Sequence, residues 1–220
     1  MSTFAAHLLA FAGAAFLLAI APGPATAVLL RQTIRHGRAR GFATVAGIES
    51  GVFFWAVMAA LGVTALLSAS EIAYTVLRVG GALMLVFLGV QAILRSRSTQ
   101  PEAPAAELAT VGAVVGISRD STRSAYRAGL VTNLANPKAG VFAVSFLPQF
   151  IPSGAPVLAT GMLLAVIWVA CDCTWYLSLT TAIHAARELF TRSTLRRRVE
   201  RLTGVVLIGF GVRLAVQSQP

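Results

Sequence analysis

The chain has 220 residues, of which 56% are hydrophobic and 12% are charged, and its mean hydropathy is +0.76. Soluble domains carry roughly 25% charged residues, so this composition excludes an ordinary soluble domain and is typical of an integral membrane protein. The length is too short for several domains, but it suits about six membrane spans of ~20 residues each.

Long apolar runs predict an all-α protein whose spans follow one another along the chain. The first run has no Lys or Arg before Arg31, so it lacks the charged start of a signal peptide, and we expect it to be retained as the first span. The predicted spans are Phe4–Leu30, Phe42–Leu67, Ile72–Leu94, Tyr126–Ile151, Val157–Ala185 and Leu202–Val216.

The net charge of +10 is concentrated in alternate connectors. Those after spans 1, 3 and 5 hold 15 of the 18 basic residues, whereas Ser68–Glu71 and Pro152–Pro156 hold none. The positive-inside rule therefore places the basic connectors in the cytoplasm and both termini outside. We interpret the charge as a signal of topology in a lipid bilayer and not as the mark of a nucleic-acid partner. The basic residues concerned are Arg31, Arg35, Arg38, Arg40, Arg95, Arg97, Arg119, Arg123, Arg127, Arg187, Arg192, Arg196, Arg197, Arg198 and Arg201.

The one long connector, Ser96–Ser124, divides the chain into two halves of three spans each. It gives three units: residues 1–95, a cytoplasmic linker 96–124, and residues 125–220. Arg78–Gly81 in the third span is echoed by Arg201–Gly204 in the sixth. Three is an odd number, so two halves of one fold lie in opposite orientations, and the sequence predicts a 3+3 inverted repeat.

Proline interrupts the first and fourth spans at corresponding places, at Pro22-Gly23-Pro24 and at Asn136-Pro137-Lys138. A break inside a bilayer persists only where it faces protein or a wet cavity. Paired breaks in two halves are the best pointer in a sequence to the binding site of a transporter. We therefore predict broken helices 1 and 4 with the site between them.

The two breaks predict a receptor for a carboxylate, because a helix N-terminus offers orphan donors and a partial positive charge. Asn136 has the order of an N-cap before Pro137. We expect free N–H groups on Lys138, Ala139 and Gly140 and, at the first break, on Gly23, Ala25 and Thr26. The Lys138 ammonium would strengthen the attraction.

Two acids lie inside predicted spans, Glu49 in the second and Asp172 in the fifth. Each costs roughly 2.5–3.5 kcal/mol at the centre of a membrane helix, so both are expected to face a cavity or a partner. The alternatives for them are a substrate ammonium, a proton, or pairing with Lys138, Arg78 or Arg213. Asn133 and Asn136 are one turn apart and both are expected to reach the cavity.

Other residues exclude some functions. The sequence shows no nucleophile–base–acid set, no phosphate loop and no metal-ligand cluster, so we expect neither an enzyme nor a cofactor. Cys171 and Cys173, with no nearby second pair, make a poor zinc site. Gly47 and Gly51 have the GxxxG spacing of closely packed helices, which favours packing inside the bundle over a homo-oligomer contact.

Several motifs together resemble the LysE/RhtB family of amino-acid exporters over nearly the whole chain. They are Ala21–Pro24 followed by Gly37–Gly41, Leu83–Leu94, Gly129–Lys138, Phe146–Phe150 and Arg201–Gly211. The resemblance assigns motif positions to Pro22, Gly23, Pro24, Asn133, Asn136, Pro137 and Lys138. One position departs from it, because Gly51 is followed by Val52 where many members have Asp.

The resemblance implies export of amino acids or close derivatives across the bacterial inner membrane, driven by the proton gradient. Alternating access at the paired breaks is the expected mechanism. An exporter of another small solute or cation, a non-transporting membrane scaffold, and a redox protein using Cys171 and Cys173 are the alternatives.

Overall fold

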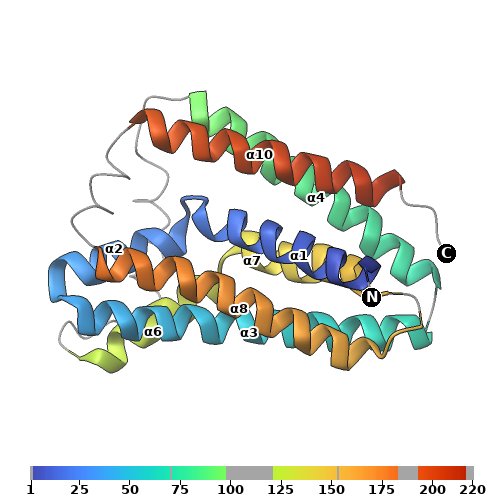
Figure 1. The fold of residues 1–220 in the computed structure, drawn as a ribbon, viewed down its shortest axis with the longest axis horizontal. Coiled ribbons are helices and arrows are strands. Elements are labelled where there is room, and N and C mark those ends of the chain that lie inside the picture. Colours follow the sequence, from blue (N-terminus) through green and yellow to red (C-terminus); the bar gives the residue numbers. More distant parts are fainter. Residues whose placement is uncertain (1, 70, 98–120, 153, 183–192, 217–220) are drawn as a thin grey trace.

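The computed structural model describes residues 2–69, 71–97, 121–152, 154–182 and 193–216, and all regular structure within these ranges is helical (Figure 1). The all-α prediction is confirmed for these residues. In chain order the helices are α1 (Ser2–Ile20), α2 (Pro24–His36), α3 (Arg38–Ala69), α4 (Glu71–Arg97), α6 (Thr122–Leu134), α7 (Pro137–Val141), the π-helix η1 (Phe142–Phe146), the 3-10 helix η2 (Leu147–Phe150), α8 (Val157–Thr181) and α10 (Ser193–Val216).

The break predicted in the first span is present, and the chain bends by 56° between α1 and α2. Gly23 is the N-cap of α2 with an extended backbone (φ −161°), and Pro24 takes the first helical position. Proline is well suited to that position, because an N–H there has no partner within the helix and φ is already close to the helical value.

The break predicted in the fourth span is present too. α6 ends at Leu134, and α7 begins at Pro137 with Asn136 as its N-cap. Helical structure continues from Pro137 to Phe150, but only its first turn is α-helical, and η1 and η2 follow. Single π-turns inside helices occur frequently at functional sites.

The span prediction is supported in part. Within the described residues, Arg38–Gly62 of α3 and the whole of α8 are each long and apolar enough to cross a membrane, and the bent α1–α2 pair makes a third candidate. Val79–Leu94 of α4 is a shorter apolar segment. Helices extend into both ends of the predicted linker, of which residues 98–120 lie outside the described ranges.

The helices form a bundle with α4 and α10 side by side on one face and α3, α6 and α8 on the other (Figure 1). α1 and α7 lie between these two groups. α3 contacts both α6 and α8, and α1 contacts α8. This arrangement brings the two breaks together in the interior.

Glycines allow neighbouring backbones to touch. A Cβ on Gly47 of α3 would overlap the carbonyl oxygen of Tyr126 on α6, and a Cβ on Gly129 of α6 would overlap the carbonyl oxygen of Thr44. The GxxxG spacing therefore packs α3 on α6 within one chain, which confirms the preferred interpretation. On the other face Gly89, Gly204 and Gly211 pack α4 against α10 in the same way.

An aromatic cluster fixes α1, η1 and α8 to one another. The ring centroid of Phe142 lies 4.6 Å from that of Phe146 and 4.7 Å from that of Trp168, and the centroid of Phe11 lies 5.3 Å from that of Phe150. Phe11, Phe142, Phe146 and Trp168 are almost completely buried. Rings at these distances add packing energy beyond their buried area, so the helices beside the second break are held firmly.

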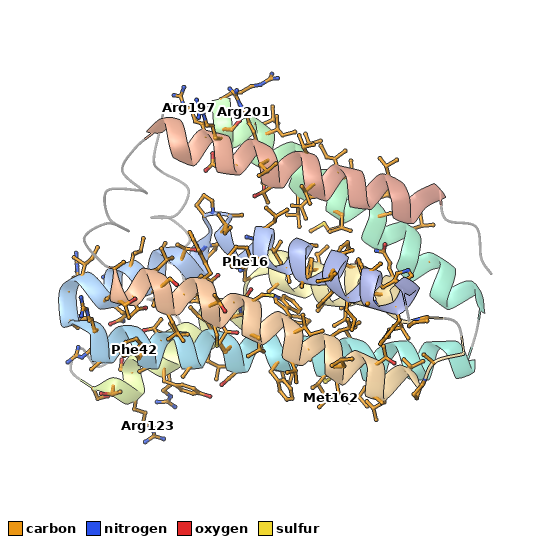
Figure 2. The ribbon with its side chains drawn as sticks, viewed as in Figure 1. Phe16, Phe42, Arg123, Met162, Arg197 and Arg201 are labelled. Atoms are coloured by element: carbon orange, nitrogen blue, oxygen red, sulfur yellow. The ribbon has the colours of Figure 1, made fainter. Side chains whose placement is uncertain are left out.

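Three arginines near the starts of helices lie toward one end of the bundle (Figure 2). Arg123 at the start of α6 and Arg197 and Arg201 near the start of α10 lie at the end where α2 meets α3. The N-terminal end of α1 and the C-terminal end of α10 lie toward the opposite end. The positive-inside argument would place the end with these three arginines in the cytoplasm.

Candidate functional site

A small polar cavity lies where the two breaks meet. Its volume is about 20 Å³, which is room for about one water molecule. Six helices (α1, α2, α3, α6, α7 and α8) and the second break contribute to its lining: Leu18, Ala19, Ala25, Val52, Asn133, Asn136, Lys138, Ala139, Trp168, Asp172 and Tyr176. Both predicted asparagines reach it, as expected from their spacing.

Lys138 links the two breaks. Its ammonium donates hydrogen bonds to the carbonyl oxygen of Leu18 (2.6 Å) and to that of Ala21 (3.2 Å) at the C-terminal end of α1. Those carbonyls have no partner within the broken helix, and a cation at a helix C-terminus is further stabilised by the helix dipole. Lys138 is the only lysine of the chain. Lys138 therefore caps the C-terminal end of α1 with its ammonium, while its own backbone belongs to the first turn of α7.

The expectation that α7 presents free N–H groups is wrong. The N–H of Lys138 donates to the side-chain oxygen of Asn136 at 3.1 Å. The N–H groups of Ala139 and Gly140 donate to the backbone oxygen of Asn136 at 3.1 and 3.2 Å. The N-cap Asn136 thus satisfies the first of these donors with its side-chain oxygen and the other two with its backbone carbonyl. Positive charge at this break therefore comes from the Lys138 ammonium.

Glu49 of α3 and Asp172 of α8 form a pair of buried acids beside the cavity. They leave only 7% and 5% of their surface exposed, and each lies in the electrostatic field of the other. Asp172 also interacts electrostatically with Lys138, whose ammonium forms its hydrogen bonds with carbonyls and not with a carboxylate. Both carboxylate oxygens of Glu49 and Oδ1 of Asp172 have no hydrogen-bond partner among the described residues.

Close packing of α3 and α6 positions Asn133. Gly51 has no side chain, and a Cβ there would lie 2.8 Å from Oδ1 of Asn133. That oxygen is buried, as is the hydroxyl of the adjacent Thr132, and neither has a hydrogen-bond partner in the part of the chain that the structure describes. Buried polar atoms are nearly always paired, so a cluster of unpaired acceptors indicates a place where a donor binds. The site thus holds one cation, two acids and further acceptors around one cavity.

The chain was compared with known proteins. Residues 16–218 match the sequence profile of the LysE type translocators. The chain belongs to the LysE type translocator family. A leucine efflux protein of Klebsiella pneumoniae is 30% identical over 95% of this chain and 94% of its own length. A leucine efflux protein of Enterobacter is 29% identical over 91% of both chains, and an uncharacterized membrane protein of Bacillus subtilis is 26% identical over 94% of this chain and 97% of its own length. No solved structure matches.

Membership confirms the resemblance seen in the motifs and makes the protein a membrane transporter and not an enzyme. At the level of the family, it supports amino-acid export. Within the described part of this translocator, no three His, Cys, Asp or Glu side chains are grouped so as to hold a metal ion. The cysteines in α8 are free thiols and half-buried.

The translocator brings most of the predicted site residues to one region. Ala25, Asn133, Asn136, Lys138 and Asp172 line the cavity, and Glu49 lies next to it. Pro22, Gly23, Pro24 and Thr26 form the first break itself, with Thr26 buried at the start of α2. Pro137 begins α7 and lines a different pocket on its far side.

Trp168 and Tyr176 line the cavity from α8; the sequence left Trp168 open as apolar bulk or cavity lining without a role, and sequence reasoning missed Tyr176. Tyr176 lies beside Thr26 and in the field of both acids. The two residues are four positions before and four positions after Asp172, so they share its helix face. This i±4 spacing around Asp172 could have identified both residues from the sequence, but only if the helix face that carries Asp172 were already known to line the site.

Proposed function

We propose that this protein is a secondary-active exporter of amino acids that works by alternating access. The observation that carries the proposal is the cavity between the two breaks, where Lys138, Glu49 and Asp172 supply charges of both signs. A zwitterionic amino acid has an ammonium and a carboxylate a few ångströms apart, and it needs such a pair of charges. Family membership and the leucine efflux relatives support the same function.

In this proposal the ammonium of the substrate binds among the unpaired acceptors of Glu49, Asp172 and Asn133. Its carboxylate binds the Lys138 ammonium, which has three donors and uses two of them for α1. The first N–H groups of α2, at Ala25 and Thr26, face the same break and add donors at a helix N-terminus. These donors and acceptors at the break replace the water molecules that a zwitterion loses when it enters the membrane.

The two acids also give a route for coupling to protons. Buried carboxylates of like charge repel one another, so the pair is stabilised by whichever cation is present, a substrate ammonium or a proton. We propose that protons and substrate compete for Glu49 and Asp172. This competition would couple export of the amino acid to entry of protons. An imposed proton gradient should then accelerate export above simple exchange.

The cavity of about 20 Å³ is too small for any amino acid, so transport requires the helices around it to separate. We propose that the bends at Gly23 and Asn136 act as hinges. These positions already lack continuous helical hydrogen bonds, so bending there disrupts little. Alternate opening to the two sides of the membrane would follow.

We further propose six spans arranged as a 3+3 inverted repeat in the inner membrane, with both termini outside and residues 96–124 in the cytoplasm. The matched breaks at α1–α2 and α6–α7, the pairing of α4 with α10, and the arginines at one end of the bundle support this arrangement. The units would be residues 1–95 and 125–220.

The test is counterflow in proteoliposomes, with leucine as the first substrate because of the relatives. Glu49→Gln and Asp172→Asn should each reduce exchange at least about tenfold, which corresponds to about 1.4 kcal/mol, while expression is unchanged. Thr181→Ala, at an exposed position near the end of α8, serves as the control. Folded protein that exchanges none of a broad panel of amino acids would refute the proposed function. Full exchange in both acid variants would refute the assigned roles.

A further inference from the structure

A second, larger pocket lies on the other side of α7 from the charged cavity. Its volume is about 390 Å³, and it is open on one side. Pro137, Gly140, Val141 and Val144 line it at helical spacing, whereas the intervening Lys138 and Ala139 line the charged cavity. Asn136 lines both spaces. The two sites are therefore neighbours that meet at the second break.

The lining of this second pocket is apolar and carries no charge. Gly80 and Gly81 remove side chains from the facing side of α4, and Met84 borders the space from the next turn. The ring of Trp55 from α3 lies over Gly140, where an added Cβ would be 3.2 Å from the ring. An apolar space with a few polar groups at its edge is typical of a small-molecule site.

Three of the lining residues have polar side-chain atoms. Ser145 lines the pocket from η1 and Asn136 from the second break. Trp55 lines it from α3, and its Nε1–H is buried with no hydrogen-bond partner among the described residues. A ligand entering here meets an apolar wall and these polar groups.

We propose that this pocket receives the side chain of the exported amino acid, and that the substrates are therefore large apolar amino acids, aliphatic or aromatic. The proposal rests on the proposed function, because the charged α-groups are taken to bind at Lys138 and the acids. The charged cavity has no room for a side chain, whereas the second pocket is large enough even for an aromatic one. A basic or acidic side chain would find no counter-charge there, which costs far more than the loss of a methylene group.

Gly80 offers a clean test, because a Cβ added there meets nothing within 4 Å. Because Gly80 lines the pocket, we expect the leucine side chain of Gly80→Leu to take up part of its volume. Gly209→Leu on α10 is the matched control, since Gly209 is also exposed with open space around it and does not line the pocket. Counterflow is measured with leucine, phenylalanine and alanine for the wild type and both variants.

We expect Gly80→Leu to reduce leucine and phenylalanine exchange at least about tenfold relative to alanine, since a few methylene groups in an apolar pocket discriminate by about that much. Gly209→Leu should leave the ratios unchanged. Met84→Ala enlarges the pocket and should raise phenylalanine exchange relative to leucine several-fold, which keeps the proposal testable if Gly80→Leu fails to fold.

Unchanged ratios in Gly80→Leu and Met84→Ala would overturn the assignment. An equal loss for all three amino acids in Gly80→Leu would overturn it too, and is the result expected if a lipid acyl chain fills the pocket. Absence of exchange of any amino acid by the wild type is a separate outcome, because it refutes the proposed function itself.

Discussion

Replacing Lys138 by methionine should destabilise the bundle as well as stop transport. Methionine keeps most of the length and apolar volume of lysine but removes the ammonium that binds the carbonyls of Leu18 and Ala21. Hydrogen bonds to a charged group contribute about 1.5–3 kcal/mol each in proteins, whereas hydrogen bonds between membrane helices average about 0.6 kcal/mol. For the two bonds together we expect a loss of about 3 kcal/mol in the free energy of unfolding, because both carbonyls would be left unpaired.

The assay is reversible unfolding of the purified protein in mixed micelles, followed by circular dichroism, with counterflow measured on the same preparation. Arg123→Gln is the control, since it removes a positive charge from an exposed position on α6 and should change stability by less than about 0.5 kcal/mol. Lys138→Met with the stability of the wild type would refute the argument that Lys138 caps α1. Loss of transport at unchanged stability would leave Lys138 with a role toward the substrate alone.

Three further predictions follow from the packing and the charges. Gly51→Ala should reduce exchange, since its Cβ displaces the Asn133 side chain at the cavity, and it should cost less stability than Gly47→Ala, whose Cβ meets the backbone of Tyr126. Thermal unfolding and exchange measured on both variants separate the two effects; equal losses of stability and of exchange in both would contradict the prediction. Tyr176→Phe should slow exchange about tenfold, because it removes a hydroxyl that lies near both acids. Tyr126→Phe is the control, since it removes only a hydrogen bond to Ser50 away from the cavity, and it should leave the exchange rate unchanged. Equal exchange rates in the two variants would contradict the role of Tyr176. In a chain without Cys171 and Cys173, a cysteine at Ser2 should react with an impermeant reagent added outside intact cells, and one at Arg38 should not; the reverse pattern would invert the proposed topology.

The sequence by itself determined the features that depend on local chemistry. Pro24 and Pro137 cannot continue a helix, so both breaks appear where the residues predict them, and Asn136 caps α7 as its side chain dictates. Gly47 and Gly51 packed two helices closely, as their spacing predicts. Family membership was equally legible in the motifs, since backbone breaks and glycine contacts restrict the residues that fit.

Tertiary structure decided which groups meet. Whether Lys138 pairs with an acid or with a carbonyl depends on where α1 ends relative to α7. These two helices are more than a hundred residues apart in the sequence, and in the fold the Lys138 ammonium donates to the carbonyls at the end of α1. The contact of α3 with α8 brings Glu49 near Asp172 and near Tyr176. The apolar pocket by Gly80 exists only because α4 faces α7 across it. Spacing along one helix fixes a face, but packing against other helices fixes what that face touches.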